Sequence, residues 1–339
     1  MMTGRERCSL IISRKEADRC GFWLGNPHPD TLPIYHRYFG TTTLEELHRK
    51  LGSDLRWLSP QMMEGTYRHP RGEGLFDVRK YKKSLAEPGP LAACESVRDL
   101  DAYEWPDIEY LDFTESLTAL RQAGPYYIAS GFWMPWFHDT SDLFGMEVFL
   151  TRMITHPELV ESALARVCTF YYEANERFYG AAEDLIDGFF FGNDFGTQRG
   201  LLISPGRFDE FFLPWIRAFA EQAHRHGLQV LMHSCGSVAE IIDRLIGAGI
   251  ECLHPLQSLA HGMSAEALAG RWKGKIAFLG GIDTQELLVK GTPQEVRAEV
   301  RRVRELLGPS LIISPSHEAL LPNVSPQNLA AMAEEACVS

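Results

Sequence analysis

The segment that decides the fold class of this chain is Leu228-Gln229-Val230-Leu231-Met232-His233-Ser234-Cys235-Gly236-Ser237. An apolar stretch ends in His233 and Cys235, two residues apart, and a glycine follows them. Residues 238–248 then carry apolar side chains at helical spacing, so the segment predicts a strand, a tight turn and a helix. Side chains two residues apart on an extended chain point to the same side, so His233 and Cys235 face together at the carboxyl end of the strand. Ligands of α/β proteins bind at this end.

Strands and helices alternate regularly on both sides of this segment. We expect strands at residues 126–130, 188–192, 228–233, 250–254, 275–280 and 311–314, and helices at residues 144–155, 157–179, 205–225 (bent near Pro214), 238–248, 264–271, 293–307 and 326–336. This alternation is typical of a parallel sheet with helices outside it. One or two weaker strands upstream make a closed (β/α)8 barrel, also called a TIM barrel, the favoured α/β fold. A doubly wound open sheet is the alternative, but the sequence contains no glycine-rich dinucleotide or phosphate-loop fingerprint.

The chain is predicted to be one domain over residues 1–339. Residues 1–124 would form an N-terminal extension with extra helices and the first barrel strands, and residues 125–339 the regular repeats. Within the extension we expect a helix at 13–19, a loop at 25–33, a helix at 43–51, a hairpin plus one strand within 52–93 (including an extended piece at 76–82), and loops with one short helix at 87–107.

Composition narrows the function classes. The chain has 45 acidic and 33 basic residues, a formal net charge of -12, which argues against nucleic acid and anionic membranes as partners. Its seven cysteines are scattered, so we expect reduced thiols in a cytoplasmic protein and no disulfide framework. The N-terminus lacks the order of a signal peptide, and no apolar run is long enough to span a bilayer.

Polar and aromatic residues follow several of the predicted strands, where a barrel would bring them into one pocket. They are the titratable residues His233, Cys235, His254, Asp194, Asp283 and His317, the amides Gln198 and Gln257, and the aromatic residues Phe132, Trp133 and Trp136. Each has a structural alternative. Asp194 is also suited to capping a turn, and Asp283 to capping the helix that starts near Thr284. His254, before a proline, is also suited to core packing.

The pair His233 and Cys235 forms half of a zinc site. A third ligand from another strand would leave one coordination position open, which is typical of catalytic rather than structural zinc. We favour His317 as this third ligand, with His254 as the second choice. An open zinc either lowers the pKa of bound water for hydrolysis or keeps a substrate thiol as a thiolate, and the residues alone leave both chemistries open.

Several motifs together resemble the uroporphyrinogen decarboxylase superfamily over roughly residues 125–336. They are His233-Ser234-Cys235-Gly236-Ser237, Gly280-Gly281-Ile282-Asp283-Thr284-Gln285, Ser314-Pro315-Ser316-His317, Pro322-Asn323-Val324-Ser325-Pro326-Gln327-Asn328, and Ser204-Pro205-Gly206-Arg207-Phe208 with Leu213-Pro214-Trp215. The resemblance implies a (β/α)8 barrel with added N-terminal helices. It also implies one of two chemistries. Decarboxylases of the superfamily act on a tetrapyrrole without metal, using an arginine-rich N-terminal segment, whereas residues 19–27 here read Arg-Cys-Gly-Phe-Trp-Leu-Gly-Asn-Pro.

The other branch, the cobamide-dependent methyltransferases, carries zinc on a His-x-Cys motif and a later cysteine. His233 and Cys235 match this motif, and His317 stands near the position of the later cysteine. The resemblance therefore implies zinc-dependent methyl transfer between a corrinoid (cobalamin), supplied by a partner protein, and a thiol or other small acceptor or donor. It gives substrate-orienting roles to Asp194, Asp283, Ser204 and Gln257, with Gln198, His254, Trp133 and Trp136 as further substrate contacts. The alternatives are a metal-free decarboxylase of porphyrin biosynthesis and a non-catalytic ligand-binding barrel. Members are often homodimers, which we expect here.

Overall fold

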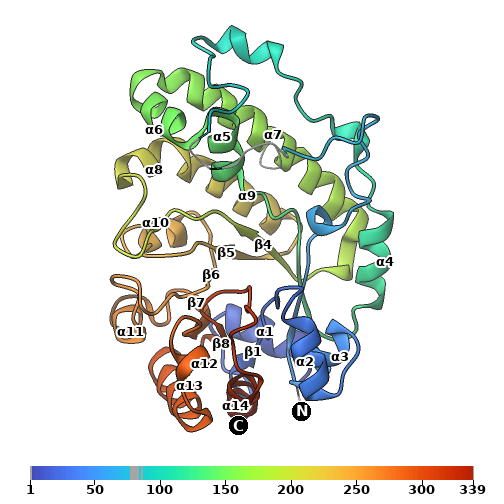
Figure 1. Ribbon diagram of the computed structural model, residues 1–339, viewed down its shortest axis with the longest axis vertical. Coiled ribbons are helices and arrows are strands. Elements are labelled where there is room, and N and C mark those ends of the chain that lie inside the picture. Colours follow the sequence, from blue (N-terminus) through green and yellow to red (C-terminus); the bar gives the residue numbers. More distant parts are fainter. Residues whose placement is uncertain (1, 77–83, 85–86, 339) are drawn as a thin grey trace.

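Eight parallel strands form the centre of the molecule, with helices around them (Figure 1). The computed structural model describes residues 2–76, 84 and 87–338. The strands pair in the order β1-β8-β7-β6-β5-β4-β3-β2, so the predicted (β/α)8 barrel is confirmed. Their bounds are β1 Gly21–Phe22, β2 Leu55–Leu58, β3 Tyr127–Ser130, β4 Gly188–Gly192, β5 Gln229–His233, β6 Cys252–His254, β7 Ala277–Ile282 and β8 Leu311–Pro315.

The helices from residue 136 onward include all those predicted, together with α5 and α12, which were not predicted. They are α5 Trp136–Phe144, α6 Met146–Thr155, α7 Pro157–Ala182, α8 Pro205–Phe211, α9 Leu213–Arg225, α10 Ile242–Gly247, α11 Ala265–Trp272, α12 Leu287–Lys290, α13 Pro293–Leu307 and α14 Pro326–Ala336. The predicted bend near Pro214 is a break into α8 and α9, because a proline fits only the first turn of a helix. Helix α10 begins four residues later than predicted, at Ile242. In the described part of the chain, no helix is both long and apolar enough to cross a membrane.

The N-terminal third departs from the prediction. It contains α1 Gly4–Ile12, α2 Leu32–Phe39, α3 Leu44–Lys50 and α4 Thr114–Gln122, with short 3-10 turns at Pro60–Met62, Val97–Ala102 and Ile108–Tyr110. The helix predicted at 13–19 is wrong: the helix lies earlier, starting after Thr3, which forms a capping box with Glu6. Of the predicted hairpin and strand within 52–93, the structure has β2, and the piece at 76–82 lies almost wholly outside the described residues.

Two apolar clusters fill the barrel and its surroundings. Because side chains alternate along a strand, Leu231 of β5 packs inside the barrel whereas Val230 and Met232 pack outward against the helices. Helix α1 contacts β1, β2, β3, β7 and β8 and adds Ile11 and Ile12 to the inner cluster. The interior is therefore a packed core closed at one end by α1, which leaves the opposite end, at the strand carboxyl ends, for a ligand.

Asp54, the residue just before β2, links β2 to β1, the two strands at opposite ends of the pairing order. Its backbone N–H donates to the carbonyl of Phe22 in β1 at 2.7 Å, and its carbonyl accepts the N–H of Tyr127 in β3 at 3.0 Å. Its carboxylate also accepts the N–H of Phe22 at 3.0 Å. The two bonds to Phe22 link β1 to the start of β2, the two ends of the strand order, and the bond from Tyr127 continues the pairing to β3.

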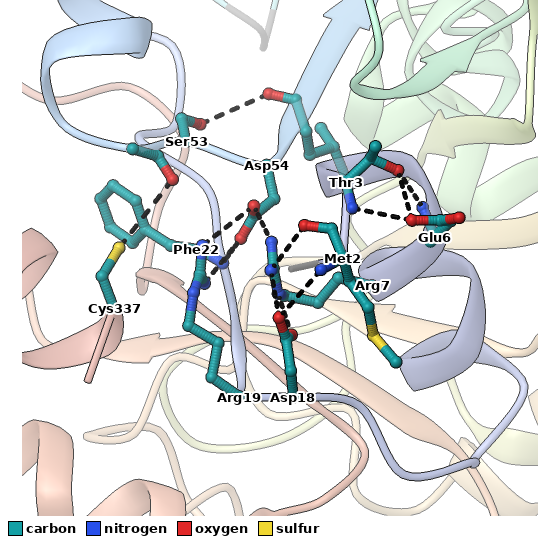
Figure 2. Close-up of polar contacts among 12 residues, drawn as sticks. Met2, Thr3, Glu6, Arg7, Asp18, Arg19, Phe22, Ser53, Asp54 and Cys337 are labelled. Atoms are coloured by element: carbon teal, nitrogen blue, oxygen red, sulfur yellow. Dashed lines mark hydrogen bonds and ion pairs between the residues drawn. The ribbon is translucent and has the colours of Figure 1, made fainter. Parts of the chain in front are cut away.

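Two arginines neutralise the Asp54 carboxylate, as Figure 2 shows. Arg7 of α1 donates at 2.6 Å and Arg19 at 2.8 Å. Arg7 also pairs with Asp18, whose pKa is lowered to about 2 chiefly by the hydrogen bond from Arg7. The side chains of Arg7 and Asp54 are only 4% and 6% exposed, so each charge depends on the other for its stability.

We predict that Asp54→Asn lowers the free energy of unfolding by about 3–5 kcal/mol, because it removes a buried carboxylate shared by Arg7 and Arg19 and leaves Arg7 paired with Asp18 alone. Urea denaturation followed by circular dichroism measures the change. Asp112→Asn is the control, since Asp112 pairs with Arg68 at the surface and its loss should leave stability nearly unchanged. Equal effects of the two substitutions would contradict a role for Asp54 in closing the barrel.

From the low pKa of His48 we predict a separate decrease in the free energy of unfolding at acidic pH. It is buried in α3, and burial together with the charge of Arg56 lowers its pKa to about 3. The unfolded chain therefore takes up this proton first, and stability falls as pH drops from about 6.5 toward 3. Between pH 7 and pH 5 this amounts to about 2 kcal/mol. Urea denaturation of His48→Leu at both pH values should show a loss smaller by that amount than in the wild type; identical losses would refute the prediction.

Candidate functional site

The strand register brings two histidines together at the carboxyl end of the barrel. His233, the last residue of β5, lies opposite Gly192 of β4 on one side and His254 of β6 on the other. Both histidines are buried, and their ring centroids are 4.9 Å apart. They stand directly above Leu231 and Cys252 of the inner apolar cluster, so they form the floor of the open end.

The loops after β4 and β5 cross closely, and this places Cys235 beside His233. The N–H of Cys235 donates to Asp194 Oδ1 at 2.9 Å, and the N–H of Gly236 donates to Gln257 Oε1 at 3.0 Å. Gly236 has a φ of 80°, and a Cβ there would lie 2.6 Å from the backbone of Gly196 in the loop after β4. Only glycine allows both the left-handed conformation and this close approach, which accounts for the glycine after the His-x-Cys pair.

The two ring nitrogens of His233 face different partners. Its Nε2 lies 3.1 Å from Asp194 Oδ1 and 3.2 Å from Cys235 Sγ. Its Nδ1 lies 2.9 Å from His254 Nδ1 and 3.4 Å from Glu318 Oε2. Among the described residues, two groups of metal-binding atoms result, each with all its atoms within 4.8 Å of one another: Asp194, His233 and Cys235, and His233, His254 and Glu318.

The charges of these residues are interdependent. Burial opposes a charge on His233, but Glu318, Cys235 and Asp194 outweigh it and raise the pKa of this imidazole well above its usual value. For His254, burial and the neighbouring charge of His233 act together and lower the pKa. Burial would raise the pKa of Asp194, yet the hydrogen bond and charge of His233 lower it. A proton on His233 thus occupies the place between carboxylate and thiol that a metal cation would take.

His317 lies at the rim of the same site. Its side chain is 39% exposed, and its ring centroid is 6.3 Å from that of His233. Its Nδ1 accepts the N–H of Ala319 at 3.1 Å. A hydrogen bond with Cys235 raises the pKa of His317. His317 therefore faces Cys235, but within the described ranges it belongs to neither group of metal-binding atoms.

A cavity of about 400 Å³ opens in front of these residues. Its lining consists of Gln61, Met62, Trp133, Pro135, His138, Gly192, Asp194, His233, His317 and Glu318. The Trp133 ring forms one wall, with its centroid 5.2 Å from that of His233 and 4.8 Å from that of Trp57. It lies over Gly192, where a Cβ would come within 2.2 Å of the indole ring. The expectation that Trp133 lines the pocket agrees with this position.

Trp136 and Ser204 lie elsewhere, contrary to expectation. Trp136 begins α5, and its buried ring packs against Phe191 and Phe219 in the layer between strands and helices. The turn into α5 aims this side chain away from the barrel mouth, three residues after Trp133. Ser204 is an exposed residue that caps α8 by accepting the N–H of Arg207 at 3.3 Å.

Asp283 caps a helix, which was the structural alternative to a role in the site. Its carboxylate accepts backbone N–H groups of Gln285, Glu286 and Leu287 at 3.2, 2.7 and 2.9 Å at the start of α12. The amides Gln198 and Gln257 hydrogen-bond to each other at 3.0 Å. Gln257 lines a second cavity of about 330 Å³, which shares the wall made by His317.

Six lining residues were not among the predicted site residues: Gln61, Met62, Pro135, His138, Gly192 and Glu318. Glu318 carried a sequence signal for a place in the site, because it directly follows His317 at a strand end. His138 had none: it lies in the first turn of α5, and its Nε2 accepts the N–H of Asp194 at 3.3 Å only because α5 packs over the barrel mouth. Gln61 comes from the 3-10 turn after β2, where its Oε1 accepts the N–H of Met134 at 3.0 Å.

Comparisons with known proteins agree with this architecture. Residues 88–337 match the family model described as uroporphyrinogen decarboxylase (URO-D). No curated protein matches the chain. Among solved structures, a methyltransferase from Methanosarcina mazei is similar, with a TM-score of 0.68 and 17% identity over 99% of this chain and 98% of that one. At that identity the likeness concerns the fold.

The family match covers the segments that carry the candidate metal ligands, whereas Gln61 and Met62 of the cavity lining lie before it. It includes the loop that carries Asp194, strand β5 with His233 and Cys235, and β8 with His317. The expected resemblance is thereby confirmed at the level of the family. The chain belongs to the uroporphyrinogen decarboxylase family.

Proposed function

We propose that this protein is a zinc-dependent methyltransferase that moves a methyl group between a corrinoid and a small thiol or related substrate. The observation that carries the proposal is the pairing of Cys235 Sγ with His233 Nε2, 3.2 Å apart, at a cavity large enough for a small molecule. The fold shared with the Methanosarcina mazei methyltransferase supports it. A thiolate and an imidazole at the carboxyl end of barrel strands are typical ligands of catalytic zinc.

The spacing of these two atoms fits zinc. Ligands of a tetrahedral zinc with bonds of about 2.0–2.3 Å lie about 3.3–3.6 Å apart, so His233 and Cys235 need move only slightly to share the ion. When bound there, zinc would keep a substrate thiol ionised at neutral pH. A third ligand would come from another segment of the chain, as the groups of metal-binding atoms around His233 allow.

The cavity residues would bind and orient the substrate. Trp133 offers a flat apolar wall, while Gln61 and His138 add polar groups around the mouth. In transfer to a thiol, the sulfur lone pair forms the new bond to the methyl carbon, and the thiol proton passes to solvent. The cobalt–carbon bond breaks and its electron pair stays on cobalt. We expect the corrinoid to be a co-substrate carried by a separate protein, which approaches the barrel mouth.

The lining of the cavity disfavours the alternative of tetrapyrrole decarboxylation. A substrate with many carboxylates needs arginines for bidentate capture. The residues that line the cavity include neither arginine nor lysine in the described part of the chain, and Asp194 and Glu318 would repel carboxylates.

Metal content and methyl transfer test the proposal together. We expect about one zinc per chain by elemental analysis and loss of methyl from free methylcob(III)alamin, followed by its absorbance, with a panel of small thiols. Cys235→Ala should lose the zinc and lower the rate more than about 100-fold, since even residues outside the metal's direct ligands cost 10–100-fold. Cys337 is a half-buried cysteine near the C-terminus, and Cys337→Ala should change neither the zinc content nor the rate. Decarboxylation of uroporphyrinogen by metal-free protein, or ligand binding without turnover, would overturn the proposal.

Gly192→Ala tests the role of the Trp133 wall. The added methyl would clash with the indole and displace it, so kcat/KM should fall about 10- to 100-fold. Zinc content should stay unchanged, because Gly192 contributes no metal-binding atom. Gly206→Ala, in α8 with open space around it, serves as the control. Wild-type efficiency in Gly192→Ala would mean that Trp133 does not shape the substrate site.

A further inference from the structure

We propose that Asp194, from the loop after β4, is the third ligand of the metal, and that His317 stays outside the coordination sphere. This inference rests on the proposed zinc site at His233 and Cys235. It changes the composition of that site from two histidines and a thiolate to a histidine, a thiolate and a carboxylate. It also moves the third ligand from one side of the barrel mouth to the other.

The position of Asp194 fits this role. Its Oδ1 lies 3.1 Å from His233 Nε2 and accepts the backbone N–H of Cys235 at 2.9 Å. A carboxylate oxygen of Asp194, a ring nitrogen of His233 and the Sγ of Cys235 all lie within 4.8 Å of one another. The 3.1 Å separation is close to the roughly 3.4 Å expected between nitrogen and oxygen ligands of a tetrahedral zinc. A carboxylate oxygen is an ordinary third ligand beside imidazole and thiolate.

The loop that carries Asp194 is firmly attached. The N–H of Asn193 donates to the carbonyl of His233 at 3.0 Å. The Asn193 side chain accepts from the N–H of Phe137 at 2.9 Å and donates to the carbonyl of Met134 at 3.0 Å. Asn193 is itself buried, so these bonds fix the carboxylate of its neighbour before any metal binds.

The hydrogen bonding of His317 opposes ligation. Because its Nδ1 accepts the N–H of Ala319, the proton of the neutral ring sits on the other ring nitrogen, Nε2. A protonated nitrogen has no lone pair for a metal. Ligation through Nε2 would move the proton to Nδ1 and break the bond with Ala319. His317 is instead suited to donate its N–H toward the sulfur of Cys235.

The partners of His233 Nδ1, on the opposite edge of the ring, favour metal binding through Nε2. His254 and Glu318 both face its Nδ1, at 2.9 and 3.4 Å. They favour the tautomer with the proton on Nδ1, which leaves the Nε2 lone pair directed at Asp194 and Cys235. A neutral imidazole binds a metal through one nitrogen, and the thiolate lies on the Nε2 side. His254 and Glu318 are therefore positioning residues that orient His233.

Metal affinity separates the two candidates for the third ligand. Apoprotein is titrated with zinc against a chromogenic chelator, and with Co²⁺ to follow the thiolate-to-cobalt charge-transfer band. Asp194→Asn should weaken zinc binding more than about 100-fold, while His317→Gln, which keeps an N–H donor, should weaken it less than about 10-fold. Asp209→Asn, a surface carboxylate on α8 paired with Arg244, is the matched control and should bind like the wild type. Both variants should keep the cobalt–thiolate band, and thermal unfolding checks that each remains folded.

The outcomes are distinguishable from failure of the proposed function. If Cys235→Ala abolishes zinc binding and the band, but His317→Gln weakens binding more than Asp194→Asn does, only the assignment of Asp194 is overturned. If Glu318→Gln abolishes binding while Cys235→Ala does not, the metal lies on the Nδ1 side of His233 and the assignment also fails. A wild-type protein that binds neither metal overturns both proposals.

Discussion

The site depends on the register of three neighbouring strands. His233 projects into the barrel because it is paired with Gly192 on β4 and His254 on β6. Side chains alternate between the two faces of a strand, so a slip of one residue would turn His233 outward, into the apolar layer where Met232 now packs. The same register leaves space above Gly192, which the Trp133 ring occupies. The contact of His233 with His254 follows from this register, whereas Asp194, Cys235 and Glu318 reach His233 from the loops after β4, β5 and β8.

The two ends of the barrel handle buried charge differently. At the closed end, Asp54 shares its carboxylate between two arginines and a backbone N–H, and its oxygens are saturated. At the open end, Glu318 Oε2 and His254 Nε2 are buried without a hydrogen-bond partner in the described structure. Such atoms occur elsewhere too, for example Tyr127 Oη at the closed end, but these two belong to a group of metal-binding residues around His233. The closed end therefore holds the barrel together, and the open end keeps binding capacity for a ligand.

Sequence patterns predicted the strands after residue 125 well even where they are short, as β6 is, because each apolar run there alternates with a segment whose apolar residues have helical spacing. In the N-terminal third the helix expected at 43–51 is confirmed as α3, but the helix expected at 13–19 is wrong and β1 was not predicted. Strands β1 and β2 exist through distant partners: Asp54 binds Arg7, 47 positions earlier in the chain. Asp18 and Arg19, which read as part of a helix, serve this same cluster instead. Local helix and strand propensities do not depend on contacts between distant residues, so they cannot predict these.

The sequence by itself determined that the chain alternates strands and helices, and that His233 and Cys235 emerge together from one strand end. These properties depend on spacing along one segment, which fixes the direction of each side chain. Only the tertiary structure decided which distant groups meet that pair. It placed Asp194 and Glu318 against opposite edges of the His233 ring and turned Asp283 to cap a helix. Contacts between segments depend on strand register and on the path of the loops, and neither is encoded in the spacing of residues within a single segment.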